Sequence, residues 1–180
     1  MAERKMIDAD GHIREIESDV FEYLPEHYKS RREAVLYFPL LPHHGWHRQA
    51  GSGGMGASFL IPTLKDWQKA LDQGNIEAAV VYPTRFMHIG QVGMVDFAVD
   101  LSRAYNDYLY DRFLCQESRL KGIAVLPLQD VAAAVAELRR GVKERSTAWW
   151  AVFCPPTDCL DPWAIRISIL STRRLIAWVA

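Results

Sequence analysis

The feature that most constrains the fold is an alternation of short apolar runs with amphipathic helical segments. Residues 76–83 form a nearly continuous apolar run, which is typical of a strand buried on both faces. Residues 120–127 predict a further strand, and residues 5–12 predict one near the amino terminus, in which apolar or small residues lead into two acids and a histidine. Strands that alternate with helices predict a parallel sheet joined by right-handed crossovers.

The helices are predicted from apolar residues at helical spacing. One helix is expected over residues 63–73, with Thr63 as its cap and Gly74 at its end. Further helices are expected over 92–118 and 131–142. Residues 18–32 predict only one or two short helical turns. Three strand–helix units fit either an open doubly wound sheet or the beginning of a (β/α)8 barrel. In both architectures the site lies at the carboxyl ends of the strands. The glycine-rich motifs of nucleotide-binding open sheets do not occur, so that version loses support.

Composition limits the class of protein and its partners. The 180 residues are enough for one core, and 49% hydrophobic with 24% charged residues is ordinary for a soluble globular protein. The net charge of −1 argues against a nucleic-acid or anionic-membrane partner. No apolar run is long enough for a membrane span or a signal peptide, so we expect a cytoplasmic protein. The three cysteines are irregularly spaced and predict neither a disulfide framework nor a zinc ribbon.

Two acids and a histidine stand at alternate positions where the first strand ends. Asp8, Asp10 and His12 would share one face of an extended strand. A carboxylate beside an imidazole forms half of a divalent-metal site. The alternative is a strand that simply turns into a loop through Asp10 and Gly11.

Two loops carry further polar candidates. The loop after the second strand holds Arg85 and His88, which could contact an acidic substrate or be neutral to function. The long Gly/Pro-rich segment over residues 38–62 is either functional or disordered. Its His43, His44 and His47 are interpreted as a solvated surface feature rather than a second metal site.

Five short motifs follow one another along residues 5–145. They are Ile7-Asp8-Ala9-Asp10-Gly11-His12, Tyr82-Pro83-Thr84, Ala104-Tyr105-Asn106-Asp107, Arg119-Leu120-Lys121-Gly122 and Leu126-Pro127-Leu128-Gln129-Asp130. In this order they resemble the amidohydrolase-related family of metal-dependent hydrolases and decarboxylases, which includes the aminocarboxymuconate-semialdehyde and resorcylate decarboxylases.

The resemblance implies an α/β fold, namely the first three to four units of a (β/α)8 TIM barrel. It implies that Asp10 and His12 are metal ligands, with Asp10 in place of the commoner histidine, and that Asp8 is structural or supports the ligands. One Zn²⁺ or Mn²⁺ would activate water or polarise a small carboxylated or aromatic substrate. The family takes a further histidine ligand and an acid/base aspartate from later strands, so the catalytic residues are expected beyond the end of this chain.

The composition changes at about Ser146. Four of the six tryptophans lie in the last 35 residues, and glycine does not occur after Gly141. Codons for Ala148-Trp149-Trp150-Ala151 must encode Val-Gly when they are read two bases later. With permitted choices at the degenerate codon positions, the whole shifted frame encodes a family-like strand, loop and helix. We therefore predict that residues 1–145 are the amino-terminal part of the barrel and that residues 146–180 are an out-of-frame tail. The alternative is a natural divergent terminus.

Three functions follow from these interpretations. The first is a metal-dependent hydrolase or carboxy-lyase that acts on a small carboxylated or aromatic molecule. The second is a truncated, catalytically inactive fragment of such an enzyme, which would retain metal weakly because two protein ligands rarely hold an ion. The third, an open-sheet binding module, lacks any ligand motif. A partial barrel leaves strand edges unpaired, which predicts homo-oligomerisation or non-specific association.

Overall fold

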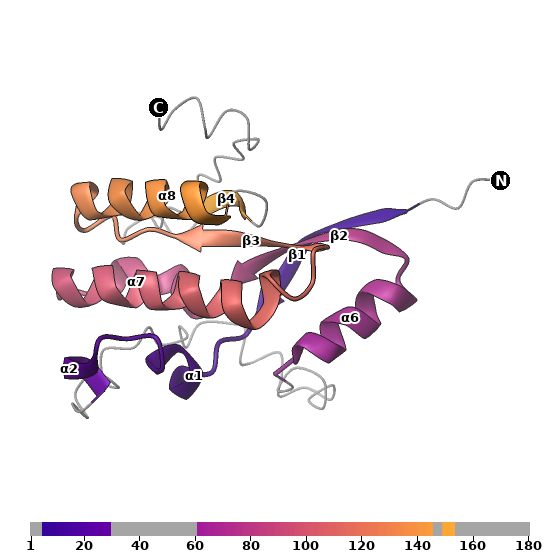
Figure 1. The fold of residues 1–180 in the computed structure, drawn as a ribbon, viewed down its shortest axis with the longest axis horizontal. Helices are drawn as coiled ribbons and strands as arrows, with labels where there is room; N and C mark the ends of the chain where they lie inside the picture. Colours follow the sequence, from indigo (N-terminus) through magenta and orange to yellow (C-terminus); the bar gives the residue numbers. More distant parts are fainter. Residues whose placement is uncertain (1–4, 30–60, 146–148, 154–180) are drawn as a thin grey trace.

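The computed structural model describes residues 5–29, 61–145 and 149–153, which Figure 1 shows in colour. One parallel sheet holds four strands in the order β1-β2-β3-β4. These strands are β1 (Met6–Ile13), β2 (Ile76–Pro83), β3 (Leu120–Val125) and β4 (Trp149–Phe153).

The order of the strands in the sheet follows their order in the chain. An open dinucleotide-type sheet reverses direction at a switch point, whereas consecutive strands of a (β/α)8 barrel are neighbours. In the described part of the sheet no reversal occurs, so its topology is that of the first units of a barrel.

The helices connect successive strands and agree with the sequence periodicity. The two long ones, α7 and α8, run along the sheet in Figure 1 and contact each other. The helix predicted over residues 92–118 begins at Val95, and its last turn, Tyr110–Leu114, is π-helical. The helical elements are α1 (Glu17–Phe21), α2 (Glu26–Lys29), α6 (Leu64–Gln73), the 3₁₀ segment η1 (Phe86–Gln91), α7 (Val95–Leu109), the π-helical segment η2 (Tyr110–Leu114) and α8 (Val131–Arg145).

The β2 strand is buried on both faces, as its apolar run predicts. Ala79 and Val81 belong to the main core beneath the helices. Val80 points to the other face, where it forms a small cluster with Ile123 of β3 and the partly buried Tyr82. Successive residues of a strand point to opposite faces, so the second cluster marks the side that becomes the interior of a barrel.

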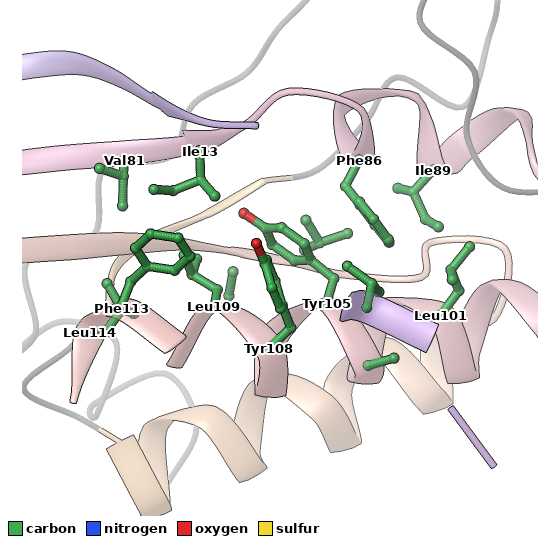
Figure 2. Close-up of a cluster of buried hydrophobic side chains, with 14 of the residues drawn as sticks. Ile13, Val81, Phe86, Ile89, Leu101, Tyr105, Tyr108, Leu109, Phe113 and Leu114 are labelled. Atoms are coloured by element: carbon green, nitrogen blue, oxygen red, sulfur yellow. The ribbon is translucent and has the colours of Figure 1, made fainter. Parts of the chain in front are cut away.

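The main core lies between the strands and α7. Figure 2 shows side chains from β1, β2, η1, α7 and η2 packed into one layer. The rings of Phe86 and Tyr105 stack at 4.6 Å between centroids, which joins η1 to α7. This packing fixes the segment that follows β2 against the long helix, and that segment carries the predicted substrate contacts.

The start of α6 shows how local sequence positions an element. Thr63 and Asp66 form a reciprocal capping box, so the predicted Thr63 cap is confirmed. The helix ends at Gly74, and Asn75 turns the chain into β2 with a φ of 49°. Asparagine tolerates this left-handed conformation better than most residues do.

Two predictions concern segments with little or no description. β4 lies inside the segment predicted to be an out-of-frame tail, and it pairs parallel to β3. The origin of residues 146–180 stays a prediction. His43, His44 and His47 lie outside the described residues.

None of the described helices has the length and apolar character that a membrane span requires.

Candidate functional site

Asp10 and His12 come together at the carboxyl end of β1. The Nε2 atom of His12 lies 3.9 Å from Oδ1 of Asp10. Zinc binds both nitrogen and carboxylate oxygen at about 2.0–2.2 Å, so two ligand atoms at this separation fit one shared ion. The Asp10 side chain is 94% exposed, and that of His12 is 33% exposed. The pair is therefore open to an incoming ion or substrate.

Asp8 does not continue the same alternation. The pairing of β1 with β2 is irregular here, because Asp8 lies opposite Ala79 while Gly11 lies opposite Val81. Three steps along β1 therefore match two along β2, as in a β-bulge, and the alternation assumed for Asp8, Asp10 and His12 is interrupted. Oδ1 of Asp8 instead accepts the backbone N–H of Asp10 at 3.0 Å. Asp8 thus supports the backbone that carries Asp10.

The ring of His12 lies against residues at the end of β2. Its centroid is 5.8 Å from that of Tyr82, and its Nδ1 atom lies 3.5 Å from the Thr84 hydroxyl. That hydroxyl donates its hydrogen to the carbonyl oxygen of Ile13 at 2.8 Å, so an oxygen lone pair remains for Nδ1. This arrangement favours a proton on Nδ1 and leaves the Nε2 lone pair on the side of Asp10.

The described residues bring together two candidate metal ligands, Asp10 and His12. Among them, no group of three or more histidine, cysteine, aspartate or glutamate side chains could hold an ion. Structural and catalytic zinc sites take three or four protein ligands. Asp10 and His12 therefore fit a metal as one corner of a coordination shell.

Glu15 is a buried carboxylate beside this corner. It is 3% exposed, and its two oxygens accept the backbone N–H groups of Thr84 and Arg85, each at 2.9 Å. Burial raises the pKa of Glu15 to about 7, although backbone hydrogen bonds, those of Arg85 and Thr84 among them, act in the opposite direction. The carboxylate joins the end of β1 to the segment that follows β2.

Arg85 lies at the carboxyl edge of the sheet, as predicted. Its Nη1 atom forms a 3.4 Å ion pair with Oε2 of Glu17, and its side chain is 17% exposed. A cavity of about 320 Å³ is lined by Arg14, Glu15, Ile16, Glu17, Ile61 and Arg85. Neither Asp10 nor His12 lines this cavity, so Arg85 and the metal corner occupy adjoining rather than identical places.

His88 lies on η1, one helical turn beyond Arg85. It is partly buried, and this burial lowers its pKa. The uncharged form of the ring is therefore favoured, and in this form one ring nitrogen can donate a hydrogen bond while the other accepts one. His88 does not line the cavity beside Arg85.

Sequence comparison relates part of the chain to a decarboxylase. No family model matches. A stretch of 76 residues is 36% identical to the gamma-resorcylate decarboxylase of Rhodococcus jostii (strain RHA1), which amounts to 42% of this chain and 23% of that protein. The chain thus matches about a quarter of its curated relative's length.

Structural comparison leads to similar proteins. The 2,6-dihydroxybenzoate decarboxylase from Rhizobium aligns with a TM-score of 0.52 at 17% identity, over 82% of this chain and 37% of that chain. A 2,6-dihydroxybenzoate decarboxylase complexed with 2,6-dihydroxybenzoate aligns with a TM-score of 0.50 at 19% identity and the same coverage. The predicted resemblance to the amidohydrolase-related family is confirmed. The fold is that of the first units of a TIM barrel.

Some of the motifs quoted from the sequence have a structural role. Asn106 of α7 bonds both backbone groups of Val125 and also Glu137 of α8. Arg119, just before β3, contacts Glu117 at 2.8 Å and Asp72 at 2.7 Å. These motifs fix helices to strand ends, whereas the first motif and Thr84 contribute to the candidate site.

Sequence reasoning missed Glu15, and it included Thr84 in a motif without assigning it a contact. Glu15 is in phase with the buried Ile13 two residues earlier, so a charged residue stands at an inward-facing position. A charged residue in phase with buried ones could have indicated a buried carboxylate from the sequence alone. The contacts of Thr84 had no local signal, because its partners His12 and Ile13 are more than 70 residues away along the chain.

Proposed function

We propose that this chain provides the first units of a metal-dependent carboxy-lyase that acts on a small aromatic carboxylate. The observation that carries the proposal is the Asp10–His12 pair at the carboxyl end of β1, in a fold shared with 2,6-dihydroxybenzoate decarboxylases. Gamma-resorcylate and 2,6-dihydroxybenzoate are two names for one acid, so both comparisons lead to the same chemistry. This agreement favours carboxy-lyase over hydrolase.

The chain's own residues have separate tasks in this proposal. Asp10 and Nε2 of His12 would hold one divalent ion, Zn²⁺ or Mn²⁺. When bound, the ion supplies Lewis-acid polarisation of the substrate's carboxylate or phenolate oxygen. Thr84 orients the His12 ring through Nδ1, and Asp8 fixes the backbone of Asp10.

The substrate-binding residues in this proposal are Arg85 and His88. The guanidinium of Arg85 can attract a carboxylate at the edge of the cavity, where its present partner is Glu17. The neutral His88 supplies a hydrogen bond to a phenol or carboxylate. The remaining ligands and the acid/base group would come from later strands of a barrel, which the described residues do not include.

A catalytically inactive fragment is the second candidate. Two observations favour it: the described residues offer only two ligands, and the composition changes at Ser146. The coding sequence tests the frame hypothesis directly. A reading two bases later that yields a strand, loop and helix supports it, and stop codons within residues 146–180 in that frame would end it.

Metal loading separates the two candidates. The full chain is chelated, reloaded with Zn²⁺ or Mn²⁺ and analysed for bound metal, and then assayed for CO₂ release from 2,6-dihydroxybenzoate. The carboxy-lyase proposal expects about one ion per chain and metal-dependent release that Asp10→Asn abolishes, with Glu117→Gln as a matched carboxylate control. Absence of both retention and release favours the inactive fragment.

A further inference from the structure

We propose that Glu15 is a positioning residue of this site, because its buried carboxylate fixes the backbone that places Thr84 against His12 and Arg85 at the cavity. The inference deepens the proposed function, since it concerns how the same site is held. No residue of the sequence motifs performs this task, and Glu15 itself does not touch the metal corner.

The geometry is that of a two-point clamp. Oε1 accepts the N–H of Thr84 and Oε2 accepts the N–H of Arg85, so one carboxylate group holds two consecutive amides. These amides lie directly after β2, where the strand ladder has ended. Consecutive N–H groups that converge on an anion form a concave backbone site that fixes the local conformation.

The surroundings of Glu15 make a purely structural explanation less satisfactory. A buried carboxylate is costly for stability, and an apolar residue at the same place would serve packing better. The nearby hydroxyl of Tyr105 is buried and has no hydrogen-bond partner within the described residues, while that of Tyr108 bonds the Ile16 backbone. Figure 2 shows both hydroxyls pointing from α7 toward the strand layer.

The clamp acts on the site through Thr84 and Arg85. With its amide held, Thr84 can donate its hydroxyl hydrogen to Ile13 and turn its lone pair toward His12. The backbone of Arg85 is held by the same carboxylate, and its guanidinium lies beside Glu17. Loss of the carboxylate would therefore loosen the orientation of the His12 ring and of Arg85 together.

Amide hydrogen exchange on the metal-free full chain tests the clamp. We expect slow exchange at Thr84 and Arg85, and at least about tenfold faster exchange in Glu15→Gln, which keeps one acceptor oxygen in place of two. Glu117→Gln is the matched control, because Glu117 also accepts a backbone N–H, that of Arg119, at 3.0 Å. The control should leave Thr84 and Arg85 unchanged. Tyr105→Phe should leave them unchanged as well.

The second readout is the nitrogen-15 shifts of the His12 ring, which a merely structural role would not move. We expect the Nδ1-protonated form in the native chain and a mixture of tautomers in Glu15→Gln. Thr84→Val should produce the mixture while both amides stay protected. Fast exchange at both amides in the unmodified chain overturns the clamp without any variant. Equal acceleration by Glu117→Gln, or an unchanged His12 tautomer in Thr84→Val, also overturns it. None of these measurements involves metal or turnover, so failure of the proposed function remains distinguishable.

Discussion

Asn106 holds Val125 through both atoms of its side-chain amide. Nδ2 donates to the Val125 carbonyl at 3.0 Å, and Oδ1 accepts the Val125 N–H at 2.9 Å. Nδ2 also donates to Oε1 of Glu137, which is 2% exposed. One side chain on α7 therefore forms hydrogen bonds with both backbone groups at the end of β3 and with a buried carboxylate on α8. The carboxyl end of β3, where a barrel site would lie, depends on this residue.

Replacement of Asn106 should destabilise the fold strongly. Asn106→Leu keeps the approximate volume but leaves two buried backbone groups and Glu137 without this partner, and each unsatisfied group costs about 1–3 kcal/mol. We expect a loss of about 3 kcal/mol in the free energy of unfolding, measured by urea denaturation. Arg112→Ala is the control, because the exposed Arg112–Glu22 pair should contribute less than about 1 kcal/mol. Equal losses in the two variants would contradict the assignment.

Gly11 permits the close approach of α6 to the site strand. A Cβ atom at Gly11 would lie 2.8 Å from Cη2 of Trp67 and 3.0 Å from the Val80 carbonyl oxygen. Gly11→Ala should therefore destabilise the protein by about 1–3 kcal/mol in urea denaturation. At Gly93 a Cβ would meet nothing within 4 Å, so Gly93→Ala should change the stability by less than about 0.5 kcal/mol. A neutral Gly11→Ala would show that α6 does not press on β1.

The raised pKa of Glu15 predicts a pH dependence of stability. Its pKa is about 7 in the folded chain against 4.5 for a free side chain, so between these values the folded state binds a proton that the unfolded state has lost. Stability should then fall as the pH rises through this window, by up to about 3 kcal/mol, and stay constant with respect to this group outside it.

Urea denaturation at about pH 5 and pH 8 measures this dependence in the native chain and in Glu15→Gln. The nearby Tyr105 and Tyr108 hydroxyls stay uncharged in this range, because burial raises both pKa values. The variant should lose most of the extra decline, since the same other groups titrate in both chains. If the stability of the native chain and that of Glu15→Gln changed with pH in parallel, the decline could not be assigned to Glu15.

The elements of the fold could be predicted because their signals are local. The continuous apolar run of β2 and the helical spacing of α6, α7 and α8 each lie within one segment, and the structure confirms them. The choice between an open sheet and a barrel depends on strand order, which periodicity does not contain. The resemblance to the amidohydrolase-related family supplied that information.

Details of the site could not be predicted, because they depend on distant partners. The irregular pairing between Asp8 and Gly11 arises where β1 meets Ala79 and Val81 of β2. The two amides that Glu15 holds are 69 and 70 residues away along the chain. Alternation along one strand therefore placed Asp10 with His12 correctly, but it could not place Asp8.

Paired substitutions of Asp8 and Asp10 would test which acid binds the metal. Asp10→Asn replaces a carboxylate whose Oδ1 lies 3.9 Å from Nε2 of His12, and we expect Zn²⁺ affinity of the full chain to fall by at least about tenfold. Asp8→Asn is the matched control, since its amide oxygen can still accept the Asp10 N–H, and affinity should stay within about threefold. Competition with a chromophoric chelator measures both variants. A larger loss in Asp8→Asn than in Asp10→Asn would assign the ligand to Asp8, and would mean that the strand irregularity turns Asp8 rather than Asp10 toward His12.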